Sequence, residues 1–175
     1  MTSIVMFNYG KFQAKVDIKV LANDIALKIV QAQKDAMSGK VNSNAITNWK
    51  PSYGVYFNNV VKKTDFDYFA DLSNTEIYSY NPTSCLATYG CLEKIYVTKG
   101  NNISSIDTYL GSTHTSITGS LAIIFTRPSS EAVFFDSTSG TKLTTGFDYI
   151  QITITSPQGP FAYIDVYPSG RVQIK

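Results

Sequence analysis

The stretch that decides the fold is "VDIKVLANDIALKIVQAQKDAM", residues 16–37. Its apolar residues recur at steps of three and four, a spacing that places them on one face of an α-helix. Ser38-Gly39 then supplies a C-terminal stop, and the pattern begins near Tyr9. The sequence therefore predicts a long helix that packs one face against a sheet. That face consists of Ile18, Leu21, Ile25, Ile29, Ala32 and Ala36.

A second apolar face lies on the opposite side of this predicted helix. With residues placed about 100° apart, it contains Val5, Tyr9, Phe12, Val16, Val20 and Leu27. A helix that only covers a sheet should be polar on this side, yet polar residues gather there only toward the C-terminal end. The front half of the helix is therefore expected to leave the domain and pack against another protein. The alternative is a long loop of the same chain that folds back over Val16 and Val20.

The chain after residue 50 has a different texture, with short strand-like runs between Gly, Pro, Asn and Ser. The runs at 149–156, 161–167 and 171–175 are joined by the turn sequences "SPQGP" and "PSG", which predict an antiparallel meander. The expected fold class is α+β, with one long N-terminal helix packed on antiparallel β-sheet. The helix would occupy residues 1–39 and a β-rich head residues 40–175.

The composition is that of a globular chain. Its 175 residues are 43% hydrophobic and 16% charged, which suits one domain with a buried core. A formal net charge of +2 means that composition alone imposes no large basic surface. No run reaches the roughly 18 apolar residues that a membrane-spanning helix needs, so the chain as given is expected to be soluble.

The two cysteines, Cys85 and Cys91, lie close together in "CLATYGC". An even number of cysteines in a chain rich in Ser, Thr and Asn favours a disulfide formed outside the cytoplasm. Two free, partly buried thiols are the alternative. A metal site is not expected at this pair, because His114 is the single histidine and leaves too few ligands.

Candidates for catalysis are few, and we do not expect an enzyme or a cofactor. The acidic residues between the first strand-like runs have no nearby histidine or cysteine, and are interpreted as solvated surface. They are Asp65, Asp67, Asp71 and Glu76. His114 lies in "GSTHTSITGS", with no Gly-x-Ser-x-Gly elbow beside it.

A cation site is the second chemical possibility in this region. Asp71, Ser73, Thr75 and Glu76 offer oxygen ligands at nearly alternate positions. They include only two carboxylates, and no glycine stands at the tight turn. An ordinary polar turn is therefore the favoured interpretation.

Several segments, in their order, resemble a known family. They are "LANDIALKIVQAQKDAM" in the helix, "YGVYF", "DYFADLSNTEIY" and "IIFTRPSSEAVFF" in the middle, and "SPQGPFAYIDVYPSGRV" near the end. This order resembles bacterial type IV pilin-like proteins, and more narrowly the GspH/FimT group of minor pilins and pseudopilins. The helix segment is similar to the exposed half of the pilin helix, whereas residues 72–118 carry little of the resemblance.

The resemblance implies a structural subunit of a type IV pilus or a type II secretion pseudopilus. Its partners would be other pilin or pseudopilin subunits, and it would lie at the cell surface, or in the inner membrane before assembly. In that family about twenty apolar residues anchor the subunit in the membrane and later form the filament core. That run is absent here, and "TSIVMF" would be its end. Residues 72–118 would form a variable exposed region.

Two other binding functions fit parts of the sequence. Some FimT-like minor pilins are thought to bind DNA through basic residues near the C-terminus, where "SGRVQIK" offers Arg171 and Lys175, although Gln173 replaces a second arginine. A glycan-binding surface module is the other, because Tyr and Phe side chains and Trp49 can stack on sugars. Ordinary surface cations and core aromatics account for the same residues, so both functions rank below the filament subunit.

Overall fold

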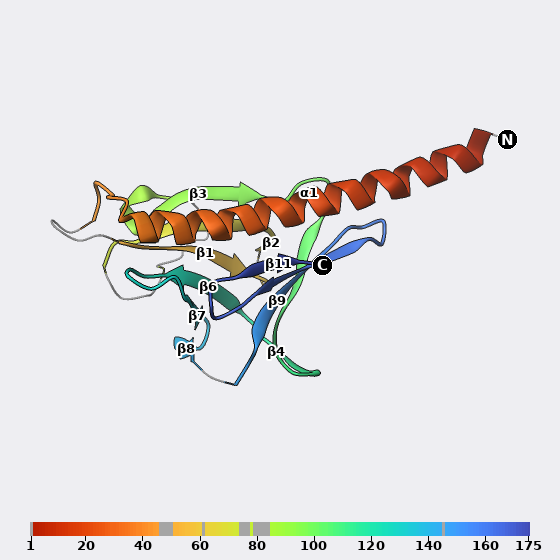
Figure 1. The fold of residues 1–175 in the computed structure, drawn as a ribbon. Coiled ribbons are helices and arrows are strands. Elements are labelled where there is room, and N and C mark those ends of the chain that lie inside the picture. Colours follow the sequence, from red (N-terminus) through yellow and green to blue (C-terminus); the bar gives the residue numbers. More distant parts are fainter. Residues whose placement is uncertain (1, 46–50, 61, 74–77, 79–84, 145) are drawn as a thin grey trace.

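The computed structural model describes residues 2–45, 51–60, 62–73, 78, 85–144 and 146–175, with side chains from Gly10 onward except at Lys62. Within them, one long helix is followed by eleven strands and one short 3-10 helix (Figure 1). The elements are α1 (Thr2–Ser38), β1 (Ser52–Asn58), β2 (Lys62–Asp71), η1 (Ala87–Tyr89), β3 (Cys91–Tyr96), β4 (Asn102–Leu110), β5 (Thr113–Ser116), β6 (Ser120–Phe125), β7 (Ala132–Asp136), β8 (Thr141–Leu143), β9 (Tyr149–Thr155), β10 (Phe161–Val166) and β11 (Val172–Ile174).

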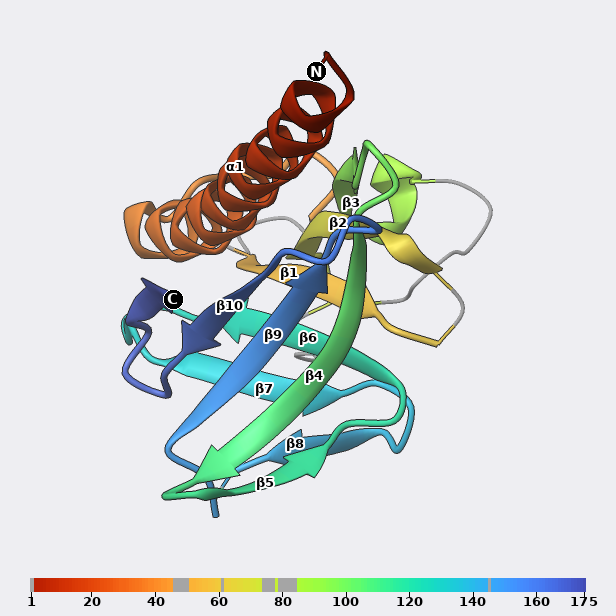
Figure 2. The same ribbon diagram turned by 90° about the vertical axis from the view of Figure 1, so that its right-hand side faces the viewer.

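Two antiparallel sheets form the body of the protein. The larger sheet has the order β3-β2-β1-β6-β7-β8, and the smaller has the order β11-β10-β9-β4-β5. Strands of the two sheets cross one another in Figure 2, and α1 lies along one side of the pair. The predicted C-terminal meander is confirmed, because β9, β10 and β11 pair antiparallel, with Ile164 opposite both Ile152 and Ile174.

A single hydrophobic core joins the helix to both sheets. In β9, Ile150, Ile152 and Ile154 point into it at every second position, as the period of a strand requires. The core also receives residues from α1 and from the inner face of the larger sheet. Its fully buried members include Ile25, Ile29, Phe57, Ile103, Ile106, Leu121, Ile123, Phe125 and Ile164.

The expected α+β fold with a pilin-like core is wrong. The described residues form a six-stranded and a five-stranded antiparallel sheet, so the protein is mostly antiparallel β-sheet with one helix at the N-terminus. The physical reason is the composition of the core, in which inner-face residues of both sheets lie in one cluster with the helix. Strand residues therefore make up most of the core that the helix covers. The fold prediction rests mainly on the helical periodicity of residues 16–37.

The larger sheet is apolar on both faces, which explains why β1 shows no hydrophobic alternation. Phe57 points into the shared core, whereas Tyr56 lies in a second cluster on the other face with Phe69 and Ile124. Tyr78 covers this outer cluster, with its ring centroid 4.4 Å from that of Phe69. The Tyr78 side chain therefore covers part of the outer face.

A disulfide joins Cys85 to Cys91, with 5.2 Å between their Cα atoms. Cys91 begins β3 and is buried in the outer cluster, so the bond holds Cys85 against the edge of the larger sheet. The expectation that residues 72–118 form an exposed region is wrong for β4. Ile103 and Ile106 of that strand are fully buried in the main core.

Three charged side chains lie buried between β2 and β3. Lys94 Nζ lies 2.8 Å from Asp67 Oδ1 and 3.6 Å from Asp65 Oδ1, and Tyr78 Oη donates to Asp67 at 3.2 Å. Burial raises the pKa of Asp67, although the hydrogen bond from Lys94 opposes the rise. The interpretation of Asp65, Asp67 and Asp71 as solvated surface is wrong, because all three are buried. No local sequence pattern indicates this burial, since the cation that pairs with two of them comes from the next strand.

Replacing Lys94 by methionine keeps a long side chain and removes its charge. We expect the free energy of unfolding to fall by about 3–5 kcal/mol at pH 7, because two carboxylates then lack their buried counter-charge. Asp67 would hold its proton more readily in the folded than in the unfolded state, so the loss should shrink as the pH falls toward about 4. Urea unfolding at both pH values measures this, with the exposed Lys63→Met on β2 as control. A loss that is equal at both pH values would contradict the assignment.

Candidate assembly surface on helix α1

Helix α1 extends beyond the sheets at its N-terminal end, and its C-terminal half lies across both of them (Figure 1). Its end is a hydrogen-bonded cap: Gly39, with φ of +64°, donates to the carbonyl of Ala36 at 3.0 Å, and the N–H of Lys40 donates to the carbonyl of Asp35 at 3.1 Å. The helix therefore stops where the Ser38-Gly39 pair predicts. The described side chains of α1 are therefore presented by one continuous helix.

One face of α1 is buried on the sheets. Leu21 lies at the margin of this face and is partly buried. Each isoleucine in the buried row stabilises the fold by about 1.5–3 kcal/mol relative to an exposed position, and the alanines allow the backbone to approach the sheets closely. The row consists of Ala14, Ile18, Ala22, Ile25, Ile29, Ala32 and Ala36.

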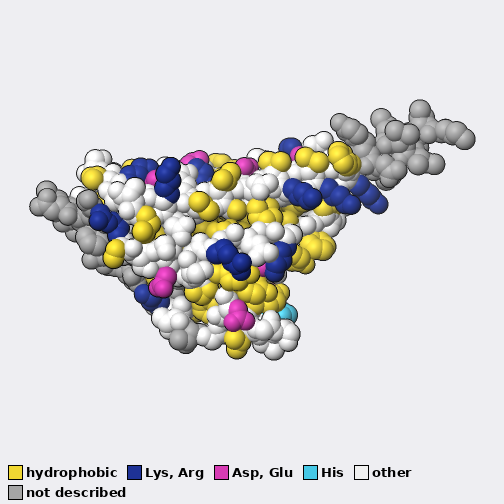
Figure 3. Space-filling view, viewed as in Figure 1, with side chains coloured by type: hydrophobic (Ala, Val, Ile, Leu, Met, Phe, Trp, Pro, Cys, Tyr) yellow, Lys and Arg dark blue, Asp and Glu magenta, His cyan; other side chains and the backbone are white. Residues whose placement is uncertain are grey.

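The opposite face of α1 is apolar and exposed. Phe12 and Leu27 each expose 65% of their surface, and Val16 and Val20 are also exposed. Figure 3 shows hydrophobic side chains along the upper edge of the molecule, where α1 runs. The side chains of Val5 and Tyr9 lie outside the described part of the structure. Because these apolar side chains gain nothing from burial in this chain, the face is a candidate contact surface.

A loop that folds back over Val16 and Val20 is not seen in the part of the chain that the structure describes. The connection between β3 and β4 does contact this part of α1, because Lys99 Nζ lies 2.6 Å from Asp17 Oδ1. The hydrogen bond from Lys99 lowers the pKa of Asp17. This contact supports the flank of α1 and leaves both valines exposed.

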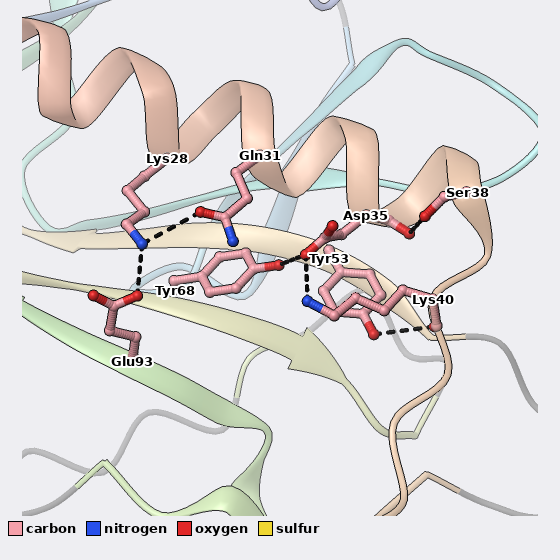
Figure 4. Close-up of polar contacts among 8 residues, drawn as sticks. All are labelled: Lys28, Gln31, Asp35, Ser38, Lys40, Tyr53, Tyr68 and Glu93. Carbon is pink, nitrogen blue, oxygen red and sulfur yellow. Dashed lines mark hydrogen bonds and ion pairs between the residues drawn. The ribbon is translucent and has the colours of Figure 1, made fainter.

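A polar cluster fixes the C-terminal part of α1 on the larger sheet (Figure 4). Tyr68 Oη donates to Asp35 Oδ2 at 2.5 Å, and Lys40 Nζ lies 2.7 Å from the same oxygen. Tyr53 Oη donates to the carbonyl of Lys40 at 3.0 Å. Together with the buried row, these contacts set the rotation of α1, and hence which of its side chains face outward.

The ionisation of this cluster follows from its partners. Burial alone would raise the pKa of Asp35, but the hydrogen bonds from Lys40 and Tyr68 outweigh it, and the pKa lies below its usual value. Burial raises the pKa of Tyr53 to about 12 and also raises that of Tyr68. Both phenols therefore keep their protons at neutral pH and act as donors.

Asp35→Asn tests the contribution of this cluster to stability. We expect a loss of about 1–3 kcal/mol in the free energy of unfolding at pH 7, because the charge-assisted hydrogen bonds are weakened. The pKa of Asp35 is lowered in the folded state. The extra stability of the wild-type chain over the variant is therefore fully present above the unfolded-state pKa of an aspartate, near 4, and is lost as the pH falls through the folded-state pKa. Thermal unfolding between pH 2 and 7 gives the curve, with the exposed Asp24→Asn as control. Equal losses at all pH values would count against the ion pair.

The two cations predicted to bind DNA already have partners. The guanidinium of Arg171 lies 3.8 Å from the ring centroid of Tyr167, and Lys175 Nζ lies 2.5 Å from Asp165 Oδ2. Asp165 is fully buried, and Gln151 donates to its other oxygen at 2.8 Å. The hydrogen bond with Asp165 raises the pKa of Lys175. Lys175 thus neutralises a buried carboxylate, which leaves a weak basis for phosphate contacts.

The turn considered as a cation site, and interpreted as an ordinary polar turn, is only partly described. Asp71 Oδ1 accepts hydrogen bonds from the backbone N–H of Ser73 at 3.0 Å and from its hydroxyl at 3.1 Å, an arrangement typical of a polar turn. Thr75 and Glu76 lie outside the described residues. Among the residues that are described, no group of three His, Cys, Asp or Glu side chains is placed to hold a metal ion.

The remaining candidates are scattered. His114 is exposed on β5 and stacks on Tyr109, with 5.4 Å between ring centroids. Trp49, the tryptophan considered for glycan stacking, lies outside the described residues. The structure brings neither of them to the exposed face of α1.

No protein-family model, curated protein or solved structure matches this chain. In the described ranges, no helix has both the length and the apolar character needed to cross a membrane.

Sequence reasoning missed two members of this surface. Val30 and Met37 are also exposed on α1, beyond Leu27, where the predicted face ended. The signal that could have found them is their spacing, since Val30 follows Leu27 by three positions and Met37 follows Val30 by seven. Each directly follows a residue of the buried row, Ile29 or Ala36, which hid the pattern.

Val16→Asp combined with Val20→Asp tests whether this face is surface or core. We expect the free energy of unfolding to change by less than about 1 kcal/mol, as for other surface substitutions. Ile25→Asp on the buried face should instead cost several kcal/mol or prevent folding, because it buries an unpaired charge. Urea unfolding followed by circular dichroism compares them. A loss of several kcal/mol in the valine variant would show that the face belongs to the core.

Proposed function

We propose that this chain is a structural subunit of a type IV pilus or a type II secretion pseudopilus, and that it assembles with other subunits through the exposed face of α1. One observation carries the proposal. The helix has two apolar faces, of which the chain's own sheets cover one and leave the other open. A helix that also extends past its domain can reach neighbouring subunits while the sheets stay on the outside (Figure 1).

The energetics of the exposed face favour association. Phe12, Val16, Val20 and Leu27 each gain about 1.5–3 kcal/mol on full burial. Association must overcome the loss of translational and rotational freedom, estimated at roughly 4–15 kcal/mol. Burial of one such side chain does not offset this loss. Several must be buried together, as happens between parallel helices of a filament.

The proposal rests on α1 and on the resemblance of residues 21–37 to the exposed half of the pilin helix. The β-domain does not carry it, because its fold differs from the one that the resemblance implied. In a filament of this kind the sheets would form the outer surface, and the disulfide-closed segment at β3 would lie on it.

Incorporation into filaments tests the proposal in cells that make the protein. Filaments sheared from the surface, or a pseudopilus fraction, are probed with antibody for the wild-type chain and for the Val16→Asp Val20→Asp variant. We expect the wild-type chain in the filament fraction and the variant only in the cells. Val60→Asp is the matched control, because Val60 is exposed to 64% on the β1–β2 turn and lies far from α1 in the sequence.

Two results would refute the proposal. One is a folded wild-type chain that never enters the filament fraction in cells that assemble filaments. The other is a double variant that enters filaments in the same amount as the wild-type chain and Val60→Asp.

A further inference from the structure

The exposed side of α1 carries a regular row of side chains that runs beyond the face described above. Starting at Val16, the row advances by alternating steps of four and three residues. Its five apolar members are among the exposed large hydrophobic side chains of the protein. We name this row the outer seam; it consists of Val16, Val20, Asn23, Leu27, Val30, Lys34 and Met37.

The spacing of the outer seam fits contact with a second helix. Steps of four and three average 3.5 residues, the period at which one helix keeps a continuous contact with another helix. In heptad terms, Val20 and Leu27 take position a, and Val16 and Val30 take position d. Ile18 and Ile25 then fall at position f, farthest from the seam, where they pack on the sheets. The chain's own domain therefore leaves the apolar residues of the seam exposed.

Charges beside the seam identify the partner and its direction. Lys19 precedes Val20 at position g, and Asp24 follows Asn23 at position e, so they lie on opposite flanks of the seam. Among the residues that the structure describes, neither has an ion-pair partner. In a parallel pair of such helices, position g of one faces the following position e of the other. Lys19 of each copy would then face Asp24 of the other.

We propose that α1 pairs with α1 of a second copy of this chain as a parallel, in-register, two-stranded coiled coil along the outer seam. An antiparallel pair is disfavoured, because it sets position e against position e and brings Asp24 beside Asp17 or Asp24 of the partner. In register, Asn23 at position d meets Asn23 of the other copy, so each amide can hydrogen-bond the other and does not face an apolar side chain. Asn23 and Lys34 also weaken the pair, so the two chains associate reversibly.

The domain leaves room for this pairing. In Figure 2 the strands lie to one side of α1, and the other side of the helix is open. A second copy related by a twofold axis along the seam would carry its own sheets on the far side. The two β-domains would thus lie on opposite sides of the paired helices.

The inference refines the proposed function, since both place another helix on the exposed face of α1, but it requires no filament. Sedimentation velocity of the full chain over a concentration series measures it directly. We expect a concentration-dependent dimer that Leu27→Asp abolishes. Leu110→Asp is the matched control, because Leu110 exposes 54% of its surface at the end of β4 and lies outside the seam.

A charge exchange tests the direction and register. Lys19→Glu alone and Asp24→Lys alone should each weaken the dimer roughly tenfold, because each turns two attractive contacts into repulsive ones. In an equimolar mixture of these two variants, a mixed dimer can form. On one flank the introduced Glu of the first variant faces the introduced Lys of the second, and on the other flank Lys19 of the second faces Asp24 of the first. We therefore expect the mixture to associate about as tightly as the wild-type chain.

The outcomes separate this inference from the proposed function. A chain that stays monomeric at all concentrations, a dimer that Leu27→Asp leaves intact, or a mixture no tighter than either single variant would overturn the inference. Filaments formed by a chain that fails these tests would leave the proposed function standing with a staggered arrangement of helices. A dimer that passes them but never enters filaments would support the inference and refute the proposed function.

Discussion

The structure depends on the packing of one face of α1 across the inner edges of both sheets. Ile18, Ile25 and Ile29 bring the helix into the same core as residues from the larger and the smaller sheet. Without this row, the sheets would share a core that is open along one side. Because the helix is rigid, burial of these residues also determines which side chains point away from the domain. The exposed apolar face is thus a geometric consequence of the core.

Polar contacts keep α1 from rotating or sliding on this core. Asp35 is held by Tyr68 and Lys40 near the C-terminal end, and Gln33 donates to the carbonyl of Ser130 at 2.8 Å on the other side. Lys99 holds Asp17 farther toward the N-terminus. Contacts at separate points along the helix present the outer seam in a fixed orientation. A fixed surface loses less conformational entropy on association than a mobile one, which favours specific partners.

The sequence predicted the helix and the C-terminal meander because each has a local signal: steps of three and four ending at Gly39, and turn sequences between alternating strands. It did not predict β4, in which Ile103 and Ile106 both enter the core although three positions apart. The register shift between Ile103 and Ser105 explains this spacing, and no periodicity rule anticipates it. The buried Asp67 was missed for a related reason, since its partner Lys94 is brought near only by strand pairing.

The two rows on α1 follow one rule. The buried row advances from Ile18 through Ala22, Ile25 and Ile29 by the same alternating steps as the outer seam, displaced by two residues, or about 200° around the helix. Equal steps make both rows drift around the helix at the same rate, so they stay on opposite sides along its length. A helix with this pattern can bind its own domain and a second helix at once. The apolar residues of α1 are therefore divided between two opposite sides, one buried on the sheets and one exposed.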